Sequence, residues 1–451
     1  MVINGKEIKI KRENAVVSEV DYAYCNLVKQ ILEEGKQTHN RTGIDTIAIA
    51  GWNYKFDLQK GFPIAETKDV KAKNFTSEIQ WIHQVQSNEV KWLQDRDNHT
   101  WDLWVVDDDG IYRIYEQGEN KIDDPEREVP LKERVINPIT GVLEEIPMLD
   151  KYGKQIMVKS KDVMDGKANA RTLKAAIWFG KEYAGTIAEA YGFINNIYKK
   201  PQSVEWTLKN NPTDRRMNIS LWQDAHIAKA VLPSCVWSSE YKVTPDGKLH
   251  SYVHQRSADV PLGLPFNIAQ YAVLLSMFAK ATDYEVGTMS WSIMDAHIYV
   301  NQLEGIKKQL KRFEYMEEYS NIIRNSSDVE IENLYNKTFD LYNKIHLHSK
   351  ELLKEDIDNM KMSKRVKELK KLDAKLATDY EEAFERKVCF EHMLTRETPQ
   401  LELANHDSIF EYSTDYVKKN DSYLKENPIG NKEIVLKKYH PTPFISMPIA
   451  Q

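Results

Sequence analysis

One cysteine stands among side chains that suit chemistry on a nucleotide. Cys235 lies within residues 214–301, the stretch of the chain that is richest in reactive and ligand-binding residue types. A thiolate is a strong, soft nucleophile, which suits conjugate addition to an electron-poor double bond such as C5=C6 of a pyrimidine. Free cysteines are more often buried and inert, so Cys235 alone decides nothing. The neighbours that the fold gives it decide its role.

Four arginines could recognise a phosphate group. They are Arg41, the adjacent pair Arg215 and Arg216, and Arg256. The guanidinium fork matches a dianionic phosphate, and four such residues are harder to explain as ordinary surface charges than one. Side chains alternate along a strand, so Arg215 and Arg216 would point to opposite faces. Only one of the pair could then easily serve a site in its own subunit.

A base and a sugar could be read by residues further along. Asn267 follows Pro265-Phe266, and its amide offers one donor and one acceptor edge, which match N3–H and O4 of uracil. An aspartate there would prefer a cytosine edge, and the alternative role for Asn267 is that of a helix N-cap. His297 and Tyr299 alternate along one strand face and could reach a sugar hydroxyl, although a packed histidine explains His297 nearly as well.

Composition limits the class of protein. The chain has 451 residues, 41% of them hydrophobic, and a formal net charge of −6, which gives no basic field for nucleic-acid binding. Three cysteines, an odd and sparse number, suit free thiols in a reducing compartment. The first residues carry no apolar signal-peptide core, and no run is long enough to span a bilayer. We therefore expect a soluble, cytoplasmic protein without membrane or nucleic-acid partners.

Periodicity predicts the elements that must position these residues. Apolar spacing predicts a helix over 21–34, a second over 72–86 that carries Glu78, and a third over 267–281. Alternation over 46–58 predicts a strand. The tail, 439–451, has three prolines and is expected to follow a fixed extended path.

Two charged stretches differ from the rest. Residues 105–184 are rich in charges and turn formers, which predicts a small β-rich elaboration or a surface excursion; the simplest reading is a solvated insertion without chemistry. Residues 303–395 have apolar residues at three- and four-residue intervals among many Lys and Glu, which predicts amphipathic helices for packing or partner contact. Neither stretch contains a recognisable catalytic constellation.

The motifs together resemble the thymidylate synthase family, which also includes phage pyrimidine nucleotide hydroxymethylases. The matching text is NRTG at 40–43, FPIAETK at 62–68, WDLW at 101–104, AYG at 190–192, DRRM at 214–217, LPSC at 232–235, QRSADVPLGLPFNIAQYA at 255–272 and DAHIYVN at 295–301. The resemblance covers residues 21–104, 185–302 and 396–451. It implies an α/β fold with a large twisted mixed β-sheet flanked by helices. It also implies one catalytic domain over 1–451, interrupted by a β-rich insertion at 105–184 and a helical insertion at 303–395, and a homodimer with the sheets back to back.

The resemblance assigns roles residue by residue. Cys235 would add to C6 of dUMP, and C5 would then attack the one-carbon unit of 5,10-methylenetetrahydrofolate, with Glu78, Tyr191 and Asp259 in the catalytic site and no metal. Arg41, Gln255, Arg256 and Ser257 would bind the nucleotide with Asn267, His297 and Tyr299, joined by Arg215 and Arg216 of the other subunit. The residues implied at the folate site are Lys68, Trp101, Trp104, Leu232, Asp259, Leu262, Gly263, Phe266, Tyr299 and Ala450.

The last chemical step depends on departures from the family pattern. The usual apolar C-terminal residue is Gln451, a usual Gln is Glu240, and Thr100 replaces an apolar residue beside Trp101. A terminal amide and an added carboxylate could hold a water at C5, so the sequence most resembles a phage dUMP hydroxymethylase that makes 5-hydroxymethyl-dUMP. The retained Trp101 favours the alternative, hydride transfer from tetrahydrofolate to give dTMP. A third alternative is a non-catalytic member of the family that acts as a binding protein.

Overall fold

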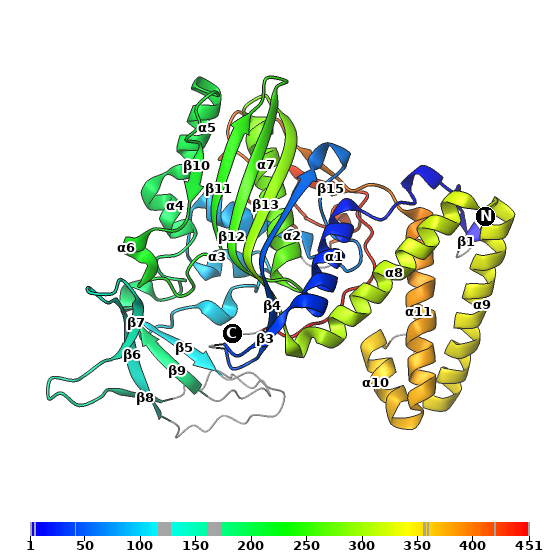
Figure 1. The fold of residues 1–451 in the computed structure, drawn as a ribbon, viewed down its shortest axis with the longest axis horizontal. Helices are drawn as coiled ribbons and strands as arrows, with labels where there is room; N and C mark the ends of the chain where they lie inside the picture. The colour runs from blue at the N-terminus through cyan, green and yellow to red at the C-terminus, as the bar shows by residue number, and fades with distance from the viewer. Residues whose placement is uncertain are drawn as a thin grey trace.

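A six-stranded mixed sheet forms the centre of the computed structural model, which describes residues 2–3, 6–40, 42–115, 128–159, 173–354, 358, 360–418 and 421–449 (Figure 1). Its strand order is β10-β11-β12-β13-β4-β3. The parallel pair β12–β13 is flanked by antiparallel neighbours. The strands are β3 (Lys36–Thr38), β4 (Thr46–Asp57), β10 (Asn218–Ser220), β11 (Val236–Val243), β12 (Lys248–Asp259) and β13 (Glu285–Tyr299). The expected α/β class with a large mixed sheet flanked by helices is confirmed.

Helices cover the inner face of this sheet. The most buried is α7 (Gly263–Ala281), whose almost wholly apolar sequence explains its place in the interior. α2 (Ala72–Gln80) packs against α7 and continues into a π-helical turn, Trp81–Val85, while α1 (Glu19–Glu34) packs on β4. The predicted helices over 21–34 and 267–281 are thus present. The latter begins four residues earlier, which places Asn267 inside the helix and makes the N-cap alternative wrong.

The smaller elements frame the nucleophile region and the ends of the chain. They are β1 (Val2–Ile3), β2 (Lys6–Glu7), α3 (Val90–Gln94), α4 (Gly192–Tyr198), α5 (Lys200–Asn210), α6 (Asp224–Ile227), β14 (Gln400–Leu403) and β15 (Ile434–Lys437). The tail up to residue 449 has no regular structure but is well anchored. The hydroxyl oxygen of Tyr439 accepts from the Val70 amide, and Gln302 donates to the Pro448 carbonyl. The fixed path predicted from its prolines is therefore confirmed as far as residue 449.

Strands within 111–115, 128–159 and 173–178 form a second sheet beside the main body, at the lower left of Figure 1. Its order is β5-β9-β6-β7, with β8 also paired to β6. The strands are β5 (Ile111–Tyr115), β6 (Glu128–Ile136), β7 (Leu143–Pro147), β8 (Met157–Lys159) and β9 (Leu173–Trp178). We call this the β-rich unit. Its apolar side chains form one small cluster of their own and share a second with Val106, Ala188 and Val231 of the main body, which explains how a charged stretch holds a defined shape.

Four helices form the unit at the right of Figure 1. They are α8 (Leu303–Asn325), α9 (Asp328–Leu353), α10 (Met362–Leu372) and α11 (Ala374–Thr395). Phe313 and Met316 of α8 and Phe390 of α11 belong to the main core, while α10 and the start of α11 enclose a separate cluster around Tyr380. The amphipathic pattern is confirmed. The apolar stripes of α8 and α11 pack on the main body itself.

Candidate active site

Cys235 lies directly before β11 and is half-buried. Its backbone amide donates to the Tyr191 hydroxyl oxygen at 3.0 Å, and its sulfur lies 3.7 Å from Nη2 of Arg256. The other cysteines are fully buried, and burial raises the pKa of the Cys25 and Cys389 thiols. Cys235 is therefore the one cysteine of the three that combines access to solvent with a neighbouring cation, as a sulfur nucleophile requires.

Arg256 also holds the loop that carries the cysteine. Its Nε donates to the Ser234 carbonyl at 3.0 Å and its Nη2 to the Pro233 carbonyl at 2.7 Å. The Arg256 amide donates to the Cys235 carbonyl at 2.9 Å, and the guanidinium lies 5.7 Å from the centre of the Trp222 ring. One side chain thus fixes the approach to the nucleophile and keeps a positive charge beside it.

Tyr191 occupies an unusual backbone conformation. Its φ of 49° and ψ of −104° lie outside the favoured regions for a residue with a side chain. The following Gly192 packs against Ser87 so closely that an added Cβ would lie 2.0 Å from the Ser87 carbonyl oxygen. Strain of this kind is held by the surrounding structure and is concentrated at functional sites. Here it directs the Tyr191 hydroxyl to the nucleophile loop.

Glu78 is a buried carboxyl group on α2. Burial raises its pKa to about 7, because the anion loses its hydration, and the donors of Trp101 and Gln270 offset part of this rise. The Trp101 Nε1 and Gln270 Nε2 atoms have no hydrogen-bond partner of normal geometry among the described residues. Near neutral pH, Glu78 can therefore both donate and accept a proton, beside two buried donors that are open to a ligand or water.

An aromatic wall stands beside Glu78. The Trp101 ring packs on Tyr191 at 5.2 Å between centroids, on Trp104 at 5.8 Å and on Trp81 at 5.9 Å. The implied folate residues Leu232, Leu262 and Phe266 are partly buried against the same core, and Gly263 opens α7 next to Leu262. These residues give the site a largely apolar side that is suited to a flat heterocycle.

A chain of amides orients Asn267. Trp291 Nε1 donates to Oε1 of Gln255 at 3.1 Å, and Nε2 of Gln255 donates to Oδ1 of Asn267 at 3.1 Å. Asn267 Nδ2 then donates to Oε1 of Gln270 at 3.0 Å. An indole N–H can only donate, so Trp291 sets the direction of every amide that follows. One lone pair on Oδ1 and one hydrogen on Nδ2 of Asn267 remain for a ligand.

The far end of β12 and β13 brings together the residues expected at the sugar. The His297 and Tyr299 rings pack edge to face, 5.1 Å apart, so the shared strand face is confirmed. Asp259 ends β12 and accepts from the Leu262 amide at 3.1 Å and from Gln302 Nε2 at 3.1 Å. Burial raises the pKa of Asp259, and the Gln302 contact opposes that rise.

The candidate phosphate ligands separate into two places. Ser257 donates to Asp295 at 3.0 Å and is adjacent to Arg256 on β12. Arg215 and Arg216 are exposed before β10, and Arg216 is bound to Asp214 at 2.8 Å. Arg41 lies outside the described residues, as does Ala450, which was expected at the folate site.

Two expectations differ from the geometry. Lys68 is buried, burial lowers its pKa to about 8, and its ammonium donates to the Pro261 carbonyl instead of facing solvent, where a folate glutamate tail would extend. Glu240 points to the open face of the sheet, 3.7 Å from His254, because its neighbours on β11 face α7. Glu240 therefore cannot hold a water at the C5 position. The Thr100 hydroxyl is bound to Asn98 at 2.7 Å.

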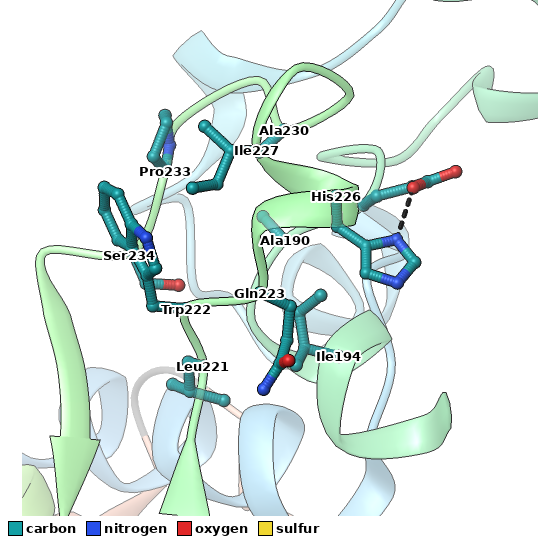
Figure 2. A pocket seen from close by; sticks show the side chains of 11 residues that line it. Ala190, Ile194, Leu221, Trp222, Gln223, His226, Ile227, Ala230, Pro233 and Ser234 are labelled. Carbon is teal, nitrogen blue, oxygen red and sulfur yellow. Dashed lines mark hydrogen bonds and ion pairs between the residues drawn. The ribbon is translucent and has the colours of Figure 1, made fainter. Parts of the chain in front are cut away.

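A small pocket lies behind the nucleophile loop. Figure 2 shows it between Trp222, Pro233 and Ser234 on one side and His226 on the other. The His226 ring is bound to Glu189 at 2.6 Å, shown as the dashed line in Figure 2. Burial raises the pKa of Glu189, but its hydrogen bonds to Tyr183 and His226 outweigh this, so the net pKa is lowered. The residues that line this pocket therefore support the loop that carries Cys235.

Sequence reasoning missed several residues that organise this site. Gln270 is a polar residue three positions after Asn267 in an apolar helix, a pattern that could have identified it. Gln302, which joins Asp259 to the tail, and Trp291 carry no local signal because their partners are distant in sequence.

In the described part of the chain, no helix has both the length and the apolar character that crossing a bilayer needs. Nor does any group of three or more His, Cys, Asp or Glu side chains there have the arrangement of a metal site.

The chain is similar to known proteins. A family model described as "Thymidylate synthase" matches residues 22–350. The thymidylate synthases of Listeria monocytogenes serotype 4a and Listeria innocua serovar 6a are each 32% identical over 300 residues, which is 64% of this chain and 86% of theirs. The solved structure of thermostable thymidylate synthase A from Bacillus subtilis is 25% identical, with a TM-score of 0.44, and the match covers 65% of this chain and 84% of that chain. With the family model matching most of its length, the chain belongs to the thymidylate synthase family.

Proposed function

We propose that the protein transfers the one-carbon unit of 5,10-methylenetetrahydrofolate to C5 of dUMP. The observation that carries this proposal is the convergence of a half-exposed Cys235, an oriented Asn267 and a buried Glu78 around the apolar side of one site. Each of the three supplies a group that the reaction needs: a nucleophile, a reader of the base and a proton carrier. A non-catalytic binding protein would need none of these together.

The first steps follow from the positions of these side chains. The Cys235 thiolate, with Arg256 beside the sulfur, bonds to C6 of the base while the C5=C6 π bond opens to an enolate with its charge at O4. C5 then bonds to the one-carbon unit as one bond from that carbon to a folate nitrogen breaks. Loss of the C5 proton and of the second folate nitrogen leaves an exocyclic methylene on C5, and Cys235 leaves C6 once that methylene has accepted a hydride or water. Glu78 is half-protonated near neutral pH and can move protons at O4 and at the folate nitrogen. Tyr191 holds the Cys235 amide and lies near C5, against Trp101.

Binding residues surround this centre. Asn267 reads uracil through its remaining lone pair and N–H, which favours dUMP over dCMP. Arg256 and Ser257 bind the phosphate with Arg41, and His297 and Tyr299 bind the sugar hydroxyl. Trp101, Trp104 and Phe266 enclose the folate with Leu262 and Asp259. The unpartnered Trp101 Nε1 and Gln270 Nε2 fit ligands that carry acceptor oxygens or nitrogens.

A homodimer completes the phosphate site in this proposal. The outer face of the sheet carries exposed Trp237, Tyr252 and Met294, a set of large apolar side chains that a second copy would cover. Arg215 and Arg216 are exposed and would reach the neighbour's nucleotide. The helical unit and the β-rich unit are then insertions in one catalytic domain.

The final step has two candidates, and the geometry gives more support to hydride transfer, which makes dTMP. The Trp101 ring packs on Tyr191 and gives the site an apolar cover, and the hydroxyl of Thr100 is bound to Asn98 and is therefore not free to hold a water. Addition of water to the exocyclic methylene would give 5-hydroxymethyl-dUMP. Of the two residues expected to hold that water, only Gln451 remains as support for this alternative, because Glu240 faces the other side of the sheet.

Two questions can be tested by mass spectrometry of the product from dUMP and methylenetetrahydrofolate, with absorbance at 340 nm followed in parallel. They are whether the one-carbon unit is transferred and which of the two products is made. A methyl product with stoichiometric dihydrofolate supports thymidylate synthesis. A hydroxymethyl product without dihydrofolate would establish the hydroxymethylase. Nucleotide binding without any product from dUMP or dCMP would overturn the catalytic proposal and favour a binding protein.

A further inference from the structure

We propose that Arg134 of the β-rich unit is a positioning residue for the nucleophile, through which this unit supports the loop before Cys235. The inference rests on the proposed function for its kinetic consequence. Its structural part, that Arg134 holds the loop before Cys235 in place, stands on the contacts alone. It replaces the simplest reading of 105–184 as a solvated insertion without chemistry.

The contacts run from the middle of β6 to the loop. Arg134 Nη1 donates to the Ala230 carbonyl at 2.8 Å and to the Val231 carbonyl at 3.1 Å. Its Nε lies 3.3 Å from the Glu145 carboxylate on β7, and its guanidinium lies 5.7 Å from the centre of the Phe179 ring. Only 10% of the Arg134 side chain is exposed, so its charge is committed to these partners.

Two arginines therefore hold the same loop from two sides. Arg134 binds the carbonyls of residues 230 and 231, and Arg256 binds those of residues 233 and 234. Four of the five carbonyls immediately before Cys235 thus accept from a guanidinium. Charge-assisted hydrogen bonds of this kind are stronger than neutral ones and have fixed geometry. The chain enters β11 along a path that neither arginine sets alone.

Packing joins the β-rich unit to the loop at the same point. Val231 is 3% exposed and belongs to a cluster with Ile177 and Phe179 of the unit, and Trp104 packs against that cluster. The Val231 amide donates to the Ile187 carbonyl at 3.4 Å, which ties the same residue to the main body. The loop is therefore fixed to the unit by apolar packing as well as by Arg134.

The consequence is kinetic. A nucleophile displaced by about 1 Å can lose about 100-fold in rate without any loss of substrate affinity. When Arg134 is replaced, the carbonyls of residues 230 and 231 lose their guanidinium donor, and the path to Cys235 then depends on Arg256, the main-chain contacts and packing. We expect Arg134→Gln to lower kcat by about 10- to 100-fold, with KM for dUMP and the dUMP dissociation constant changed less than about twofold.

Lys132→Gln is the matched control. Lys132 lies two residues away on β6 and contacts the same Glu145 at 3.7 Å, so its loss removes an equal charge from the same strand but leaves the two hydrogen bonds from Arg134 to the loop in place. Its kcat should stay within about twofold of wild type. Methylguanidine at low millimolar concentration should restore part of the activity of Arg134→Ala, because the small cation can bind the two vacated carbonyls.

Hydrogen exchange of the loop amides 229–236, measured by mass spectrometry on the whole protein, is a readout that needs no turnover. Faster exchange there in Arg134→Gln, but not in Lys132→Gln, together with the kcat loss, supports the proposal. Wild-type exchange and wild-type kcat in Arg134→Gln would overturn it. A uniform loss of protection across the chain would show only a global fold defect and would also count against it. An inactive wild-type protein whose loop still loosens in Arg134→Gln would overturn the function and leave the loop contact standing.

Discussion

The side-chain amide of Gln255 donates to Oδ1 of Asn267 at 3.1 Å, and this contact fixes which way the asparagine faces. If Asn267 reads the base, its replacement by aspartate removes the donor to O4 and supplies an acceptor for the cytosine amino group. We expect Asn267→Asp to shift the ratio of kcat/KM for dUMP and dCMP toward dCMP by about 100-fold or more. An unchanged ratio, measured with both nucleotides on one enzyme preparation, would refute the base-reading role.

Trp291 gives a second test of the same chain of amides. Trp291→Phe removes the N–H that sets the orientation of the Gln255 amide. The side-chain amides of Gln255 and Asn267 can then flip, which exchanges the positions of their oxygen and nitrogen atoms. We expect the ratio of kcat/KM for dUMP to that for dCMP to fall by about 10-fold, because the discrimination that one hydrogen bond provides is lost. The residue is fully buried, and the variant will be less stable. A ratio of two substrates measured on one sample does not depend on the folded fraction, so a preserved preference would contradict the prediction.

The raised pKa of Glu78 predicts that the free energy of unfolding depends on pH. Its folded-state pKa of about 7 is above the ordinary 4.5 because burial disfavours the anion. The folded state therefore loses stability as pH rises from 4.5 to about 7, and the penalty is complete above that pH. Glu78→Gln removes this penalty. We therefore expect the free energy of unfolding of the variant to be about 2–3 kcal/mol higher than that of wild type at pH 8, and nearly the same at pH 4.

Urea denaturation at the two pH values measures this difference. In the same variant, turnover should fall by about 1000-fold, because the amide cannot carry a proton. Equal stability changes at both pH values would argue against a perturbed carboxyl, and retained turnover would exclude Glu78 as the proton carrier.

The role of Cys235 as nucleophile can be tested because it is the one cysteine of the three that is partly exposed. Cys235→Ser should abolish turnover while dUMP binding, measured by calorimetry, stays within about tenfold of wild type. Cys25 and Cys389 are fully buried, so alkylation of the native protein should modify one thiol, and dUMP should protect it. Turnover by the serine variant would rule out the covalent adduct.

Local patterns predicted the elements better than the contacts between them. The helix over 21–34 and the strand over 46–58 were predictable because their apolar residues repeat with the periods of α1 and β4. Tyr191 and Cys235, 44 residues apart, meet through a strained backbone that only Gly192 permits, and no spacing rule predicts that. Glu240 was misplaced for a similar reason, since its face follows from the β-bulge and register of β11 on β12. Arg134 was indistinguishable from other charges in a polar stretch.

The helical unit leaves and re-enters the catalytic body at one place. Arg312 of α8 and Glu385 of α11 pair at 2.5 Å in the interior, and Arg312 also donates to the Thr67 carbonyl at 3.2 Å. α8 and α11 run in the same direction, because Lys308 pairs with Glu381 and the Tyr319 ring stacks on Phe390. The chain must therefore return along them through α9 before α11 begins. α10 lies against α9 and α11, away from that buried ion pair, so a reporter fused in place of α10 should leave the product unchanged.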